Sequence, residues 1–279
     1  MNILYIEPNF KEKTGLFNDT DNFFEEAMKL DGEVVRALEN RRTVRFEVQG
    51  RGYFIKQHFG IGWREIFKNL FQLRLPIISA KSEWLAISRL NQLHIPALTL
   101  VAYGERGVNP AKKQSFLMTE ELTNKVSLED LAKAWQIQKP TFKFKQALLR
   151  EVATIARLMH QSGMNHRDFY LCHFLLKKDQ IENLTAPGLH LILMDLHRAQ
   201  IRKKVPRRWQ VKDIAGLYFS SMDAFLTQRD LLRFLTLYFE KPWREILATK
   251  KEFLKLVRHR AVTLYHKTLS QLPGDSDED

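Results

Sequence analysis

The stretch His166-Arg167-Asp168-Phe169-Tyr170-Leu171-Cys172-His173 decides the fold, because it stands between a long amphipathic segment and a second acidic motif, Asp195-Leu196-His197. Apolar residues before it recur every three or four positions and predict a helix that Gly163 closes. After it, residues 174–176 and 189–194 predict two strands joined by a turn-rich segment. The helical positions are Phe144, Leu148, Val152, Ile155 and Met159, and the turn contains Asn183, Pro187 and Gly188.

This hairpin places two carboxylates, Asp168 and Asp195, at neighbouring strand ends, where both face one nucleotide. Phosphoryl transfer needs such a pair, so we expect Asp168 to orient or deprotonate an acceptor hydroxyl and Asp195 to bind Mg²⁺. His173 stands where protein kinases carry asparagine as a second metal ligand. Because imidazole suits Mg²⁺ less well than an amide oxygen does, the number of metal ions stays open, with Mn²⁺ as the alternative metal. His166 is expected to be structural.

The upstream half contains a candidate for holding the phosphates of ATP. Residues 34–48 and 53–58 predict antiparallel strands, and Lys56 lies on the last of them. Glu83, near the start of an amphipathic helix, is expected to hold Lys56 toward the phosphates through an ion pair.

The first predicted turn, Glu39-Asn40-Arg41-Arg42-Thr43, lacks the glycine-rich sequence whose backbone N–H groups cover phosphates in protein kinases. We expect Arg41 or Arg42 to supply charge instead. The motif that begins at Asp195 lacks the usual Phe-Gly, so no phenylalanine flip is expected.

Two more segments complete the predicted site. A buried strand at residues 115–118 leads into a linker, where the backbones of Glu120 and Leu122 are expected to hydrogen-bond adenine. Asp213 begins a later helix, where it either braces the backbone of the loop at Asp168 or is an ordinary acid favoured by the helix dipole.

The order of these parts predicts an α+β, protein-kinase-like fold of two lobes. The small N-lobe, residues 1–121, has an antiparallel sheet and one main helix and positions the nucleotide phosphates. The larger, mostly helical C-lobe, residues 122–279, carries the catalytic loop, the metal site and the acceptor platform. Its acidic end, residues 274–279, is expected to be disordered.

The net charge of +12 indicates anionic partners. Basic residues crowd soon after Asp195, where an activation segment would meet the acceptor, and this location favours an anionic substrate over a merely solvated surface. We expect Arg202, Lys203, Arg207 and Arg208 to bind substrate; Lys204 and Lys212 complete the basic run.

Six segments carry a family resemblance: Arg41–Glu47, Tyr53–Lys56, His166–Leu176, Asp195–Gln200, Val205–Trp209 and Gly216–Ser221. In these segments the chain resembles the lipopolysaccharide core heptose(I) kinases of Gram-negative bacteria, and the similarity extends from about residue 30 to about residue 240. The resemblance implies a protein-kinase-like fold and ATP-dependent phosphorylation of the first heptose of the lipopolysaccharide inner core. It also implies association with an acidic partner, acyl carrier protein.

A membrane surface is a further expected partner. Residues 63–71 predict a helix with an aromatic-rich face and basic flanks, which either packs on its lobe or lies on the anionic inner membrane. The sequence contains neither a run of ~20 apolar residues nor a signal-peptide pattern, so a cytoplasmic protein, peripheral to the inner membrane, is expected. The apolar positions are Trp63, Ile66, Phe67, Leu70 and Phe71.

The single cysteine, Cys172, excludes an internal disulfide. Its place four residues after Asp168 suggests a catalytic role, but a small buried apolar residue is the favoured interpretation.

Alternative functions stay open. A kinase for another lipopolysaccharide sugar, or for serine or tyrosine in proteins, would use the same catalytic residues. A pseudokinase scaffold that binds anionic lipid is disfavoured, because decayed sites usually lose one of the four groups Lys56, Glu83, Asp168 and Asp195, and all are present. A nucleic-acid-binding module would explain the charge, but neither zinc spacing nor an RNA-binding motif occurs, so no nucleic-acid partner is expected.

Overall fold

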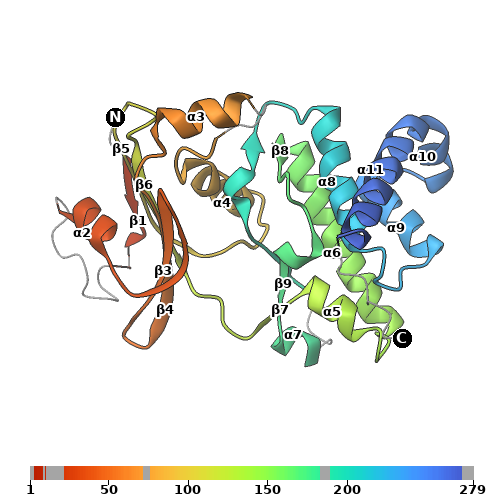
Figure 1. Ribbon diagram of the computed structural model, residues 1–279. Coiled ribbons are helices and arrows are strands. Elements are labelled where there is room, and N and C mark those ends of the chain that lie inside the picture. The colour runs from red at the N-terminus through yellow and green to blue at the C-terminus, as the bar shows by residue number, and fades with distance from the viewer. Residues whose placement is uncertain (1–2, 9, 11–21, 72–75, 183–188, 272–279) are drawn as a thin grey trace, which may run out of the picture. The chain divides into compact units, whose positions relative to one another are not determined.

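Six antiparallel strands form the sheet of the N-terminal part, in the order β1-β5-β6-β4-β3-β2 (Figure 1). The hairpin between β3 and β4 turns through Gln49 and Gly50, both with positive φ, as a two-residue loop with the right-handed twist of the strands requires. Strand β4 begins at Arg51, two residues earlier than the predicted strand 53–58. The strands are β1 Ile3–Ile6, β2 Glu33–Leu38, β3 Arg41–Val48, β4 Arg51–His58, β5 Leu100–Arg106 and β6 Gln114–Glu120.

This computed structural model describes residues 3–8, 10, 22–71, 76–182 and 189–271, so the predicted turn residues Asn183, Pro187 and Gly188 and the acidic tail lie outside it. The chain divides into two units. Unit 1 is residues 1–92, 97–123 and 196–198, and unit 2 is residues 93–96, 124–195 and 199–279.

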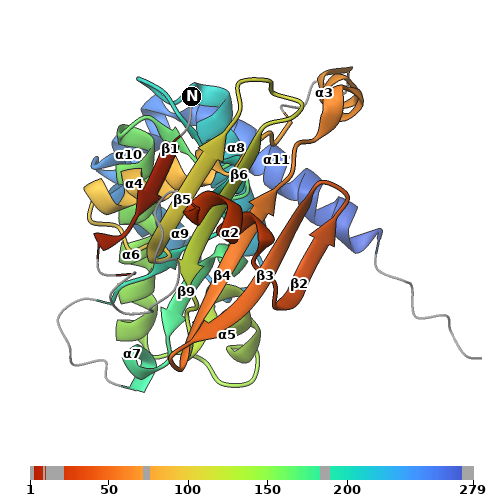
Figure 2. The ribbon, with the colours of Figure 1, turned by 90° about the vertical axis from the view of Figure 1, so that its left-hand side faces the viewer.

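The described residues of unit 1 contain one helix, α2, that the sequence did not predict, in addition to the helices expected at residues 63–71 and near Glu83. Helix α2, Phe23–Lys29, lies across one face of the sheet (Figure 2) and buries Phe23, Ala27 and Met28 against strand residues such as Ile55. Its seven residues are too few for a clear helical period. The two others in the described part of the unit are α3, Gly62–Phe71, and α4, Lys81–Gln92.

Unit 2 is mostly helical, as expected. Helix α6, Phe142–Gln161, begins at the Thr141 cap, whose side chain accepts the Phe144 N–H, and it buries the predicted apolar face. Gly163 follows with φ +84°, and a Cβ there would lie 1.8 Å from the Arg202 carbonyl oxygen. The other helices are α5 Leu128–Ala134, α7 Asp179–Glu182, α8 Arg207–Ser220, α9 Gln228–Phe239, α10 Trp243–Thr249 and α11 Lys251–Leu269.

Short strands of unit 2 carry the loops that the motifs predicted. β7 Lys125–Ser127, β9 Phe174–Lys177 and β10 Ile192–Leu193 form one small antiparallel sheet. β8 Met164–Asn165 and β11 Gln200–Ile201 form another. The predicted α+β class is confirmed, with an antiparallel sheet in unit 1 and mostly helices in unit 2. None of the helices in the described ranges is long and apolar enough to cross a membrane.

Candidate functional site

In unit 1, Lys56 and Glu83 form the expected ion pair, with Lys56 Nζ 2.5 Å from Glu83 Oε1. The Glu83 side chain on α4 is only 3% exposed, whereas that of Lys56 on β4 is 29% exposed. A buried carboxylate is costly without a partner, so Glu83 holds the ammonium group while leaving part of it accessible.

The two arginines of the first hairpin lie on opposite faces of the sheet. Arg42 is paired with Gln57, and its guanidinium bonds the Gln57 side chain and the carbonyl of Leu30, on the α2 side. Arg41 is paired with His58, two positions along from Lys56, so Arg41 shares the Lys56 face. Of the two arginines expected to replace the glycine-rich loop, Arg41 is therefore the one on the side of the sheet where Lys56 lies.

The predicted adenine linker begins at the end of β6, where Glu120 is the last strand residue, and continues to Leu122. The Glu120 N–H donates to the Thr99 carbonyl, and the Glu121 N–H donates to the Gly52 carbonyl. Glu121 also binds Arg45 of β3, with an N–O distance of 2.8 Å. These bonds fix the backbone up to Leu122, whose own N–H has no backbone partner in the described residues.

In unit 2, Asp213 braces the catalytic loop. Its carboxylate oxygens accept the backbone N–H groups of His166 at 2.7 Å and Arg167 at 2.8 Å. His160 Nε2 lies 3.2 Å from the same carboxylate, and Asp213 is fully buried. Of the two interpretations of Asp213, the contacts therefore favour the brace over a simple helix-terminal acid.

His166 connects the two acidic loops. Its Nδ1 accepts the Asp168 N–H at 3.3 Å, and its Nε2 lies 3.0 Å from the carbonyl of Met194, the residue before Asp195. Burial lowers the pKa of His166, and a neutral ring with the proton on Nε2 makes both bonds. His166 thus has the expected structural role, because its ring links the loop of Asp168 to the loop of Asp195.

His173 makes a second connection between the same loops. Its Nδ1 lies 2.7 Å from the Asp168 carbonyl oxygen, so it donates there, and Nε2 lies 3.3 Å from Asp195 Oδ2. In the neutral ring, Nε2 and the carboxylate both present lone pairs, as two ligands of one cation do. The backbone is left-handed at Arg167, φ +77°, and at Asp195, φ +60°, which is a strain common at functional loops.

The described residues contain no cluster of three or more His, Cys, Asp or Glu side chains arranged to hold a metal ion. Mg²⁺ does not require one, because it commonly takes one or two protein ligands and fills its remaining positions with water and substrate phosphates. The pair of Asp195 and His173 fits that kind of site.

The four basic residues expected to bind substrate, Arg202, Lys203, Arg207 and Arg208, differ in exposure. Arg202 is turned inward, where its guanidinium donates to Asn165 Oδ1 at 2.8 Å and also bonds Gln200. Lys203, Arg207 and Arg208 are exposed. The two arginines stand in the first turn of α8, where the helix dipole disfavours positive charge, so they suit an anionic ligand better than they suit the helix.

Cys172 is half-buried, and its surroundings suppress thiolate formation. Burial, and then the nearby Glu129 carboxylate, raise the pKa of Cys172 to about 11. Cys172 was expected to be a small buried apolar residue; it is only half-buried, and its raised pKa disfavours a catalytic thiolate.

Two features were not singled out by sequence reasoning. Lys212 Nζ lies 3.8 Å from Asp168 Oδ1. Lys212 was assigned from the sequence only to the basic run. A signal was available, because Lys212 precedes Asp213, and Asp213 was considered as a contact of the loop that carries Asp168.

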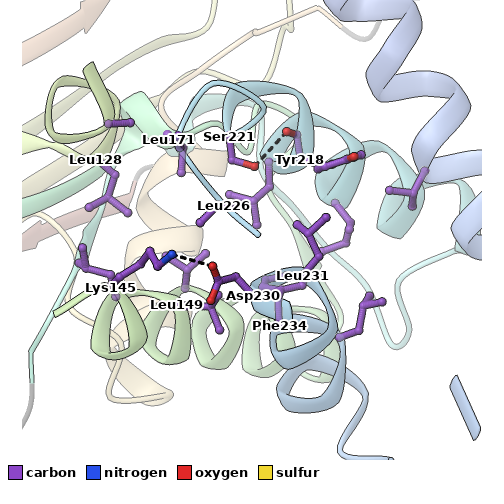
Figure 3. A pocket seen from close by; sticks show the side chains of 18 of the residues that line it. Leu128, Lys145, Leu149, Leu171, Tyr218, Ser221, Leu226, Asp230, Leu231 and Phe234 are labelled. Carbon is purple, nitrogen blue, oxygen red and sulfur yellow. Dashed lines mark hydrogen bonds and ion pairs between the residues drawn. The ribbon is translucent and has the colours of Figure 1, made fainter. Parts of the chain in front are cut away.

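The second feature is an apolar pocket of about 330 Å³ among helices α5, α6, α8, α9 and α11 (Figure 3). Leucine side chains such as Leu128, Leu149 and Leu231 point into it, and the Lys145–Asp230 ion pair lies at its wall. No single segment reveals it, because its lining comes from five separate helices.

Comparison with known proteins agrees with these motifs. Residues 25–238 match the model of the lipopolysaccharide kinase (Kdo/WaaP) family. The chain is 47% identical over 264 residues to the lipopolysaccharide core heptose(I) kinase WaaP of Pseudomonas aeruginosa, covering 95% of this chain and 96% of that protein. It is 46% identical to the WaaP of Escherichia coli K12, covering 88% and 92%.

A solved structure, described as WaaP in complex with acyl carrier protein, superposes with a TM-score of 0.77 at 43% identity. The match covers 94% of this chain and 99% of that one. The family match spans most of the chain and includes the loops of Asp168 and Asp195. The chain therefore belongs to the lipopolysaccharide kinase (Kdo/WaaP) family.

Proposed function

We propose that the chain transfers the γ-phosphoryl group of ATP to heptose I of the lipopolysaccharide inner core. The observation that carries this proposal is the double connection between the loops of Asp168 and Asp195, through the rings of His166 and His173. The loops are held together within unit 2 of a chain from this kinase family.

The roles of the residues follow from phosphoryl transfer. Asp168 accepts a hydrogen bond from the acceptor hydroxyl and aligns its oxygen for in-line attack. Asp195 and His173 would hold the divalent metal, Mg²⁺ or Mn²⁺, which would supply positive charge to the phosphates of ATP. Lys56, oriented by Glu83, binds phosphate oxygens, and the backbones of Glu120 and Leu122 receive adenine. These roles follow the division into an N-lobe, residues 1–121, and a C-lobe, residues 122–279.

The acceptor platform is proposed to be the exposed basic residues before and at the start of α8. Lys203, Arg207 and Arg208 are exposed and suit carboxylates or phosphates of the acceptor. Arg202 supports the platform from within, because its guanidinium is bonded to Asn165 and Gln200.

Helix α3 is proposed to rest on the anionic surface of the inner membrane, which would keep the protein on the cytoplasmic side, close to its acceptor. Only Ile66 of its apolar stripe is buried; Trp63 is 51% exposed, Phe67 52% and Phe71 86%. Arg64 and Lys68 flank this face, as in helices that lie in the membrane interface. Because these aromatic side chains are exposed and basic residues flank them, a membrane surface is favoured over packing on the lobe.

A liposome assay tests this surface. Wild type is expected to bind vesicles with anionic lipid at low salt and to lose binding when Trp63 and Phe71 are both changed to serine. Equal sedimentation of the variant and wild type would exclude α3 as the contact.

Acyl carrier protein is proposed as a partner, since it is in complex with WaaP in the similar structure. An acidic carrier suits a chain of net charge +12, and an acyl group suits the apolar pocket between Leu149 and Leu231. Titration with carrier protein should show tighter binding for the acylated form than for the unacylated form. Equal affinities of the acylated and unacylated forms would show that the pocket does not bind the acyl group of the carrier protein.

The central experiment incubates the purified protein and labelled ATP with dephosphorylated inner-core lipopolysaccharide. We expect label on heptose I, and a rate at least ~10²-fold lower for Asp168→Ala. Label on lipopolysaccharide that lacks heptose I would indicate another sugar acceptor, and label on serine or tyrosine peptides would indicate a protein kinase. Vesicle binding without any transfer would indicate a scaffold.

A further inference from the structure

Lys212 places a positive charge beside Asp168 that the residues after Asp168 in the loop do not supply. The residues that follow Asp168 in the loop, Phe169 to Cys172, include no lysine or arginine. Lys212 Nζ, from helix α8, lies 3.8 Å from Asp168 Oδ1, and the two side chains are only 17% and 16% exposed. This distance exceeds that of a hydrogen bond, so the contact is a Coulombic attraction in a partly desolvated setting.

Three cationic side chains lie around the indole of Trp209, near Lys212. Arg167 Cζ lies 4.8 Å from the ring centroid, Arg208 Cζ 5.2 Å and Lys212 Nζ 5.8 Å. The Trp209 Nε1 atom is buried and has no hydrogen-bond partner among the described residues. The indole thus keeps three cationic side chains in one place, and Lys212, which also lies near the Asp168 carboxylate, is suited to meet an anion there.

We propose that Lys212 is a further catalytic residue, which contacts an oxygen of the phosphoryl group while that group moves from ATP to the acceptor. The inference rests on the proposed kinase function. The attacking hydroxyl lies within a hydrogen bond of Asp168, and the phosphorus approaches to about 3–3.5 Å from the attacking oxygen. An ammonium group 3.8 Å from the same carboxylate is therefore within reach of the transferred oxygens.

In this step the bond from the acceptor oxygen to the γ-phosphorus forms, while the bond from the γ-phosphorus to the β–γ bridging oxygen breaks. The bridging oxygen keeps the electron pair and leaves as part of ADP, and the acceptor proton passes to Asp168. Lys212 keeps its protons and contributes only charge. This role differs from that of the exposed Arg207, which belongs to the acceptor platform.

The test compares full-length wild type with Lys212→Met, Lys212→Arg and a matched control, Lys255→Met, which removes an exposed lysine of α11. Lys212→Gln is carried in parallel in case methionine prevents folding, which melting temperature reports. The measurements are kcat, KM for ATP with the lipopolysaccharide acceptor, and affinity for ADP with and without fluoroaluminate, which mimics the transferred group.

For Lys212→Met we expect kcat to fall about 10²-fold with KM for ATP within about threefold, since removing one charge at the transition state has this size of effect. Affinity for ADP with fluoroaluminate should fall more than tenfold, affinity for ADP alone should stay constant, and Lys212→Arg should recover part of both losses. An unchanged kcat, or an equal loss of affinity for ADP alone, would overturn the role of Lys212. An inactive wild type would instead overturn the kinase function.

Discussion

The carboxylate of Asp213 accepts the backbone N–H of Arg167 at 2.8 Å, 46 residues earlier in the chain. Arg167 has a left-handed backbone, φ +77°, which is costly for a residue with a side chain. A second bond from the His166 N–H reaches the same carboxylate. The brace therefore holds a strained loop in the one conformation that presents Asp168.

The first prediction concerns this brace. Asp213→Asn removes one acceptor and the negative charge, so we expect a loss of about 1–3 kcal/mol of unfolding free energy and a kcat at least tenfold lower. Urea denaturation and steady-state kinetics measure the two effects. Asp223→Asn, on the surface, serves as the control. Wild-type kcat in a stable Asp213→Asn variant would show that the loop does not depend on the brace.

The Lys56–Glu83 pair leads to the second prediction. Glu83→Gln leaves Lys56 without the charge that orients it, so KM for ATP should rise about tenfold or more, while kcat changes less. Lys56→Met leaves the buried Glu83 carboxylate unsatisfied and should cost about 1–3 kcal/mol of stability. The double variant Lys56→Met/Glu83→Met should recover part of this loss. Nucleotide affinity should remain low in the double variant; a recovery there would contradict the phosphate-binding role.

The third prediction separates the two hairpin arginines. Arg41 lies on the Lys56 face, so Arg41→Ala should raise KM for ATP, by roughly tenfold for a lost charged contact. Arg42 bonds Gln57 and the Leu30 carbonyl on the other face, so Arg42→Ala should lower the melting temperature and leave KM for ATP unchanged. The opposite pattern would mean that the phosphates lie elsewhere.

His58 leads to a pH prediction. Burial, and then the Arg41 charge, lower the pKa of His58 from 6.5 to about 4. Between these values the unfolded chain binds a proton that the folded chain excludes, so acid favours unfolding. Stability should fall as pH drops from 6.5 to 4, by up to about 3 kcal/mol from this group. Denaturation curves at several pH values would give the unfolding free energy of wild type and of His58→Gln. If that free energy changed equally with pH in both proteins, His58 would be excluded as the source.

Cys172 is the subject of the fifth prediction. With its pKa raised to about 11, the thiol should react with iodoacetamide at pH 8 much more slowly than in the urea-unfolded chain. Cys172→Ser should keep kcat within about twofold, because the thiol holds no catalytic role. Rapid labelling of the folded protein with loss of activity would reverse this view.

Much of the fold and the site was predictable from local patterns. The apolar period of residues 144–159 predicted α6, and the order of Lys56, Glu83, Asp168 and Asp195 predicted the sequence of strands, helix and loops. These features are readable because each depends on residues close together in the chain. Helix α2 was missed, since its seven residues are held by the sheet beneath them and not by a period of their own.

The sequence by itself determined the residue types available for chemistry, the α+β order of elements and the family to which the chain belongs. Only the tertiary structure decided which face of the sheet each hairpin arginine occupies, that Lys212 lies beside Asp168, and that five helices enclose an apolar pocket. The physical reason is that these contacts join residues far apart in the chain. Strand register, helix packing and burial bring such residues together, and no local pattern of side chains encodes those distances.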